Sequence, residues 1–285
     1  MKKLVVVVFF LMLLAFLALA QQPTSEPVKL ELIAANLYLV TGGMGANGGL
    51  FVGDDGVLAV DAKMNRESYD QLMAELKKVT DKPVHFLVNT HSDYDHVLGN
   101  QFFPAGTLII AQDNCRQEFF HVKRDGSPAD FLKPELGPFI PAVTYRDKMD
   151  IWLGSKKVEL WYFGVGHTTG DSVVYFPEAK TAFIGDQAFL GRPQLIHAYK
   201  GGNSFAHVQT LKKMLATLAA ERFALGHDPL TDRAGIKKHI EWIEAMQEKI
   251  GQLVQQNKIL EEIKKEFKDD ESRLVEVVFN EIKKK

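Results

Sequence analysis

Short apolar runs separated by turn residues dominate the first part of the chain. Their alternation predicts strands at residues 37–41, 50–52, 57–61, 84–88 and 108–111. Residues 66–78 place apolar side chains at helical spacing and predict one amphipathic helix. Between the first two runs, the glycine-rich residues 42–49 predict either a mobile flap or a tight backbone path.

A second β-rich stretch follows a segment without periodicity. Residues 123–145 contain four prolines and predict a surface excursion. Beyond them, we expect strands at residues 149–153, 158–163, 172–176, 181–185 and 222–225. A helix is expected at about residues 204–218. Because strands and helices alternate in both halves, the pattern predicts sheets covered by helices, an α/β or α+β sandwich.

The chain is predicted to be helical from Arg233 onward. One apolar stripe runs through Ile236, Ile240, Ile243, Met246 or Gln247, Ile250 and Val254. The Lys- and Glu-rich positions between them are typical of a solvated face over an apolar stripe.

The first twenty residues have the pattern of a targeting segment. Lys2 and Lys3 precede an apolar run over residues 4–20, which ends in Ala18-Leu19-Ala20. This order predicts a secretory signal peptide over residues 1–20, cleaved after Ala20. An uncleaved anchor is the alternative, because the run is at the lower edge of a membrane span. We therefore expect a periplasmic or secreted protein without stable membrane contact after cleavage.

The net charge and the cysteine count exclude some kinds of binding partner and metal site. The 285 residues include 34 Lys+Arg and 36 Asp+Glu, for a formal net charge of -2, so no basic surface predicts a nucleic-acid partner. Cys115 is the single cysteine, which excludes an intramolecular disulfide and a cysteine-rich zinc site. A small-molecule substrate is the remaining expectation.

Potential metal ligands follow four of the predicted strands. The strand at 84–88 leads into His91-Ser92-Asp93-Tyr94-Asp95-His96, and three later strands lead into His167, Asp186 and His227. Because ligands bind beyond the carboxyl ends of strands in open α/β sheets, these side chains are expected to meet. Seven ligands suit two adjacent cations that share one carboxylate.

This ordered set resembles the metallo-β-lactamase superfamily, whose signature is His-x-His-x-Asp-His followed by a distant His, an Asp and a final His. The resemblance implies an αββα sandwich over residues 28–250, with a helical extension over residues 251–285. It also implies a two-metal site. The ligands it implies are His91, Asp93 and His167 on the first metal, Asp95, His96 and His227 on the second, and Asp186 bridging both.

Asp93 departs from the family, which usually has its second His at this position. The additional carboxylate makes the centre less positive, so hydroxide is expected to form at higher pH than in the usual site. It also shifts preference toward harder ions. Two zinc ions are expected, with iron or manganese as alternatives. Asp186, where some lactamase subclasses have Cys, resembles the glyoxalase II, lactonase and phosphodiesterase branches.

The resemblance implies a metallo-hydrolase. Hydroxide held between two cations would attack the carbonyl of an ester, thioester, lactone or β-lactam, and Asp95 is the candidate catalytic residue that orients it. Two alternatives remain open. One is an iron-dependent redox protein, similar to flavodiiron proteins or persulfide dioxygenases, and the other is a non-catalytic metal-binding relative.

Other polar residues are weighed as support or as substrate contacts. Asp61 and Asp171 are expected to support ligands by hydrogen bonding. The candidate substrate-binding residues, each of which could equally be a plain loop residue, are Asn47, His197, Tyr199, Lys200 and Asn203. Structural roles are expected for His85, His121, His207 and His239.

Overall fold

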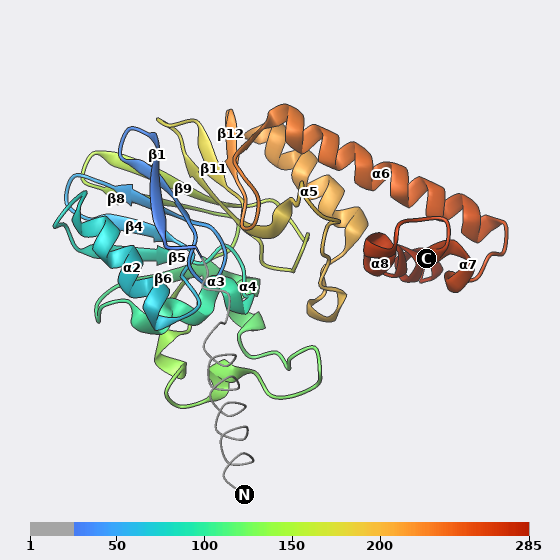
Figure 1. Ribbon diagram of the computed structural model, residues 1–285, viewed down its shortest axis with the longest axis horizontal. Coiled ribbons are helices and arrows are strands. Elements are labelled where there is room, and N and C mark those ends of the chain that lie inside the picture. Colours follow the sequence, from blue (N-terminus) through green and yellow to red (C-terminus); the bar gives the residue numbers. More distant parts are fainter. Residues whose placement is uncertain (1–25, 285) are drawn as a thin grey trace, which may run out of the picture.

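Two β-sheets packed face to face form the centre of the computed structural model, which describes residues 26–284 (Figure 1). Within these residues, the first sheet has the order β1 (Lys29–Ala34), β2 (Leu37–Thr41), β3 (Gly48–Val52), β4 (Val57–Val60), β5 (Val84–Val88), β6 (Leu108–Gln112) and β7 (Val143–Tyr145). The second has the order β13 (Thr231–Asp232), β12 (Arg222–Ala224), β11 (Thr181–Phe183), β10 (Ser172–Phe176), β9 (Lys156–Tyr162) and β8 (Lys148–Leu153).

Helices cover the outer faces of both sheets (Figure 1). Their bounds are α2 (Arg66–Lys77), α3 (Tyr94–Val97), α4 (Asp113–Glu118), α5 (Ser204–Thr217), α6 (Arg233–Gln255), α7 (Leu260–Lys264) and α8 (Ser272–Lys283). Helix α2 packs on the first sheet through Tyr69 and Leu72, and α5 packs on the second through Leu211 and Met214. This arrangement confirms the expected αββα sandwich.

Apolar side chains from both sheets fill the space between them. Leu58 and Val88 of the first sheet share one buried cluster with Leu160 and Phe176 of the second. Strands β3, β4 and β10 are buried along their whole length, because each has a sheet on one side and a helix on the other. The sheets therefore hold the loops at their ends in fixed positions.

The C-terminal helices extend beyond the sandwich (Figure 1). The predicted stripe is buried along α6, although Leu253 rather than Val254 continues it. From Met246 onward, the stripe packs against Ile263 of α7 and Val275 of α8. Ile196, which precedes α5, joins the same cluster, so the extension contacts the loop between β11 and α5.

Three strands escaped the sequence pattern, and the two-residue β13 is the shortest of them. Strand β7 lies within residues 123–145, expected as a surface excursion, and pairs in parallel with β6. It has only three residues, too few to show alternation. Strand β1 is an edge strand with mostly exposed side chains, so its apolar pattern is weak. The predicted signal peptide lies outside the described residues, and no helix within residues 26–284 is long and apolar enough to span a membrane.

Candidate metal centre

The ends of neighbouring strands deliver the predicted ligands to one edge of the sandwich. His91 follows β5, whereas Asp186 lies in the 3-10 turn η4 (Gly185–Gln187) that follows β11. His227 follows β12, and His167 lies in the connection between β9 and β10. Because β4 pairs in parallel with β5 and β11 with β12, their carboxyl ends point to the same side.

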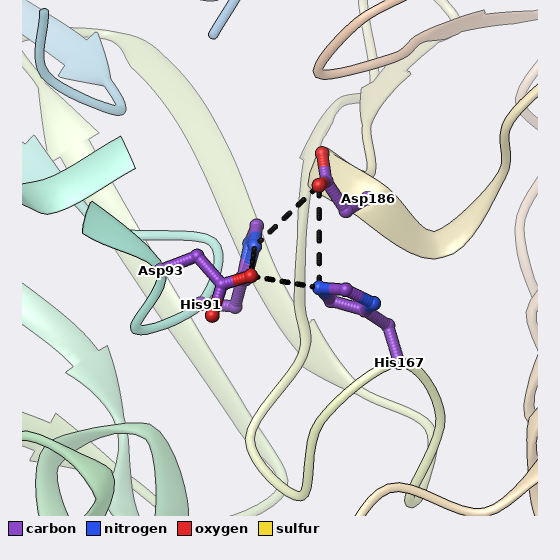
Figure 2. Close-up of side chains that lie close together, drawn as sticks. All are labelled: His91, Asp93, His167 and Asp186. Atoms are coloured by element: carbon purple, nitrogen blue, oxygen red, sulfur yellow. Dashed lines mark hydrogen bonds and ion pairs between the residues drawn. The ribbon is translucent and has the colours of Figure 1, made fainter. Parts of the chain in front are cut away.

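Four of these side chains form a first cluster (Figure 2). The ligand atoms of His91, Asp93, His167 and Asp186 all lie within 4.8 Å of one another. Asp93 Oδ2 is 3.2 Å from His167 Nε2 and 3.6 Å from His91 Nε2. Asp186 Oδ2 lies 3.9 Å from His91 Nε2. The spacing leaves room for one cation among the four.

The remaining three side chains form a second cluster beside the first. Ligand atoms of Asp95, His96 and His227 lie within 4.8 Å of one another. Asp186 also contacts this cluster, with Oδ1 3.2 Å from His96 Nε2 and Oδ2 3.4 Å from His227 Nε2. The structure thus brings all seven predicted residues together, with Asp186 between the two clusters. The part that each plays in metal binding stays a prediction.

Buried atoms without hydrogen-bond partners test whether the centre suits cations. Among the described residues, His91 Nε2, His96 Nε2 and Asp186 Oδ1 are buried and make no hydrogen bond. Such atoms are costly unless something satisfies them. A Cβ at Gly226 would lie 2.2 Å from Asp186 Oδ1, so only glycine leaves this space open. Imidazoles and carboxylates are ligands for zinc and related divalent ions, so the residues fit two such cations.

The pKa values of the ligand side chains also indicate that the carboxylates of this centre are stabilised by positive charge. Burial opposes ionisation of Asp186, but His96 and His227 hold its pKa well below the ordinary value. Burial lowers the pKa of His167, whereas Asp93 raises it more, to about 9. The pKa of His227 is also about 9, because Asp186 and Asp95 outweigh burial. Without cations, protons on histidine balance the carboxylates.

Two carboxylates support the ligands from behind, as predicted. Asp61 Oδ2 is 2.8 Å from His96 Nδ1, and Asp61 Oδ1 accepts a hydrogen bond of 2.7 Å from Thr90 N. Asp171 accepts hydrogen bonds from Thr168 N and Oγ1, beside His167. Contacts of this kind fix the orientation of a ligating ring.

A chain of hydrogen bonds behind the first cluster was not anticipated. His167 Nδ1 donates to Leu195 O at 2.8 Å, which leaves Nε2 facing the cluster. Gln194 Nε2 donates to Asp186 O and to Leu195 O, and His239 Nε2 lies 3.0 Å from Gln194 Oε1. His239, expected to be structural, is therefore linked to the ligand loops through one glutamine.

The glycine-rich residues 42–49 follow the tight backbone path rather than forming a flap. Ala46 N donates to Asp95 O, and Asn47 N donates to Gly226 O. The Asn47 side chain donates to the carbonyls of Leu225 and Asp228, on either side of His227. These contacts give Asn47 a structural role, and substrate binding by it stays a prediction.

A cavity of about 420 Å³ opens beside the ligands. Three of the candidate substrate residues line it with Asp93 and Asp95, namely His197, Tyr199 and Lys200. The lining also includes His121, Arg124 and Phe131. Part of the expected surface excursion is thus a wall of the site, and His121 lies at the cavity although its sequence context gave no sign of it.

Two polar residues have roles that the sequence did not predict. The Asn203 side chain caps α5 by accepting a hydrogen bond from Ala206 N, and it lies outside the lining of this cavity. Glu118, at the end of α4, accepts from Thr169 N and from Ser92 Oγ. No motif marks Glu118, because its partners are distant in sequence.

Comparisons with known proteins agree with this geometry. Residues 41–227 match the family described as the metallo-beta-lactamase superfamily. The chain is 27% identical over 172 residues to the 2,4-dinitroanisole O-demethylase subunit alpha of Nocardioides sp. (strain JS1661). The alignment covers 59% of this chain and 47% of that protein, so the chain spans about half the length of that relative. It is 24% identical over 245 residues to the metallo-beta-lactamase type 2 of Elizabethkingia meningoseptica, covering 80% of this chain and 89% of that protein.

Solved structures share the fold. A metallo-beta-lactamase from Pontibacter korlensis aligns with a TM-score of 0.62 and 17% identity, over 76% of this chain and 99% of its own. The DIM-1 metallo-beta-lactamase aligns with the same TM-score and identity, over 78% and 99%. Together with the match over residues 41–227, these findings show that the chain belongs to the metallo-beta-lactamase superfamily.

Proposed function

We propose that the protein is an exported metal-dependent hydrolase that cleaves an ester, thioester, lactone or β-lactam bond in a small molecule. The observation that carries this proposal is the meeting of two ligand clusters at Asp186, beside an open cavity. Similarity to a type 2 metallo-beta-lactamase supports it. Export rests on the pattern of residues 1–20 alone.

The proposed chemistry divides between the cations and the protein. Two divalent cations at these clusters would supply Lewis acidity toward a carbonyl oxygen and toward water. Asp95 lies at the cavity wall with its side chain 33% exposed, and its Oδ2 is 2.9 Å from His227 Nε2. Burial raises the pKa of Asp95, but the His227 contact together with the nearby His96 and His91 lowers it below the ordinary value. The ionised carboxylate can therefore orient a water molecule or hold its proton.

A hydrolysis panel tests the proposal. Zinc-loaded wild type, Asp186→Ala and the exposed control Asp147→Ala are compared on β-lactam, lactone, thioester and ester compounds. We add an aryl methyl ether, because one relative is named as an O-demethylase subunit. Wild type and Asp147→Ala should cleave one carbonyl class, and Asp186→Ala should fall to background. Equal rates for wild type and Asp186→Ala would contradict the proposal.

Asp93 favours a second candidate, an iron-dependent redox protein. The first cluster contains two carboxylates and two imidazoles, a set that also suits iron or manganese. Metal analysis of protein purified without added metal separates the candidates. Zinc with hydrolytic activity supports the first, and coloured iron protein without hydrolysis supports the second. Protein that gains no activity after metal loading would indicate a non-catalytic relative.

Cleavage of the first twenty residues has its own test. Mass spectrometry of protein recovered from the exported fraction of the expressing cells should give the mass of a chain that begins at Gln21. Full-length protein in the membrane fraction would instead support the anchor.

A further inference from the structure

The two oxygens of Asp93 face in different directions. Oδ2 faces the first cluster, 3.2 Å from His167 Nε2. Oδ1 lies 2.6 Å from Lys200 Nζ. Both side chains are largely buried, with exposed fractions of 16% for Asp93 and 10% for Lys200. The carboxylate can thus serve the cluster with one oxygen while the other is paired with an ammonium.

Lys200 is held at this place by its surroundings. It ends the 3-10 turn η5 (Ala198–Lys200), and Gly201 follows in the left-handed region with φ 87°. Its Nζ also donates to Ser92 Oγ at 2.7 Å, and Ser92 donates in turn to Glu118. The ammonium at the cavity wall is therefore fixed to the loop that carries Asp93.

Charge is the reason that this pair matters. Relative to the family's histidine, Asp93 adds one negative charge to the centre. The ammonium of Lys200 adds one positive charge at contact distance from the same carboxylate. In a site shielded from water, charges at this distance interact strongly. The charges of Asp93 and Lys200 cancel as a pair.

We propose that Asp93 and Lys200 together replace the second histidine of the family signature. Asp93 supplies the ligand atom, and Lys200 is a positioning residue that cancels its charge and fixes its orientation. Under this proposal the centre is as positive as the usual one, which reverses the expectation drawn from Asp93 alone. The proposal rests on the metal centre of the proposed function but not on the bond that is cleaved.

His197 holds the same carboxylate from another side. Its Nε2 lies 2.8 Å from Asp93 Oδ2, and Arg273 of α8 lies 3.4 Å from its Nδ1. Asp93 Oδ2 is the oxygen that faces the first cluster, 3.2 Å from His167 Nε2. Both oxygens of Asp93 thus have partners outside the cluster, and the side chain is positioned before any cation binds.

A double-mutant cycle that changes the charges at positions 93 and 200 tests the proposal, and it is carried out on the cobalt-substituted protein. The four proteins are wild type, Lys200→Met, Asp93→His and the double variant Asp93→His/Lys200→Met. The readout is the pH at which the visible cobalt spectrum changes, which follows the charge around the cations. We expect Lys200→Met to raise this pH by about one unit and Asp93→His to lower it by about as much. The double variant should return close to wild type.

Controls separate charge from general damage. Lys200→Arg retains the charge and should behave as wild type. Lys123→Met removes another cation from the cavity wall, one that pairs with Asp130 instead of a ligand, and should leave the spectral transition unchanged. A transition in Lys200→Met that matches wild type, or a double variant that matches Lys200→Met, would overturn the proposal.

Thermal unfolding of the metal-free proteins gives a second readout. Lys200→Met leaves Oδ1 of the buried Asp93 carboxylate without its ammonium partner, so the melting temperature should fall by several degrees. The double variant should recover most of this loss. If Lys200→Met does not fold at all, a folded double variant still supports the pairing, and two unfolded variants overturn it.

Failure of the hydrolase proposal gives a different result. If the wild type binds cobalt and the four proteins show the expected spectral shifts, but the wild type cleaves no compound of the panel, only the hydrolase proposal is contradicted. A wild type that binds no cobalt contradicts both the metal centre and the charge pairing.

Discussion

The two ligand clusters differ in how the protein holds them. In the first, the His91 and His167 side chains are 1% exposed, and Asp93 is held by Lys200 and His197. In the second, Asp95 and His227 are 33% and 26% exposed. Buried ligands with fixed partners lose little freedom when a cation binds, whereas exposed ones must be ordered. We expect the first cluster to bind its cation more tightly.

Their supports also come from different parts of the chain. The second cluster is backed directly by Asp61, which follows β4 and reaches His91 of the first cluster only through Thr90. The first is backed by the segment between β11 and α5, which packs on the C-terminal helices through Ile196. The comparison teaches that the sheets position both clusters and that the helical extension adds support to the first one only through the segment before α5.

Asp186→Ala should have the largest effect, because Asp186 contacts both clusters. Zinc affinity should fall at least about 100-fold at both sites, the upper range for loss of a ligand's support. Zinc titration against a chromophoric chelator measures this loss. Full occupancy of either site in the variant would show that Asp186 is not shared.

Asp61→Asn should affect the second cluster more than the first, because Asp61 contacts His96 directly and His91 only through Thr90. Asparagine tolerates the left-handed backbone of this position, φ 57°, but its amide nitrogen cannot accept hydrogen bonds as Asp61 Oδ2 does, and the charge facing His96 is lost. One zinc site should weaken about 10-fold to 100-fold while the other is retained. Equal weakening of both sites in the same chelator titration would contradict the separation of the clusters.

Acid should weaken the region behind the first cluster. Burial lowers the pKa of His239 to about 4 from the ordinary 6.5. The unfolded chain therefore binds more protons between these values, so stability is complete above pH 6.5 and falls as the pH drops toward 4. From pH 7 to pH 5, wild type should lose roughly 2 kcal/mol more unfolding free energy than His239→Gln.

Urea unfolding at the two pH values measures that difference. His207, whose pKa burial lowers well below its ordinary value, should leave part of the acid sensitivity in the variant. Identical pH dependence in wild type and His239→Gln would show that His239 accepts its proton in the folded state.

Arg273→Ala should have the smallest effect. Its contact with His197 is long, 3.4 Å, and reaches Asp93 only through that ring. We expect the first site to weaken about threefold, as for loss of one weak hydrogen bond. Lys283→Ala, near the end of the same helix, is the matched control and should not change zinc affinity. A loss as large as that of Asp61→Asn would mean that the extension controls the first cluster.

Local patterns predicted much of this molecule. The stripe from Ile236 to Ile250 and the strands that end before His91 and Asp186 follow from spacing along the chain. Strand β7 did not, because three residues carry no periodicity. The expectation for residues 123–145 was incomplete for a related reason: apolar positions such as Phe131 pack against partners that no local pattern identifies.

The sequence by itself predicted sheets covered by helices and the seven side chains that meet at the ends of strands. These follow from short-range order, since strand ends and motif spacing are properties of neighbouring residues, whereas the αββα arrangement was implied by the resemblance to the superfamily. Only the tertiary structure decided that Lys200 contacts Asp93 and that Glu118 contacts Ser92. Those pairs are joined by folding between segments distant in the chain, and their charges acquire meaning only at the distances that folding sets.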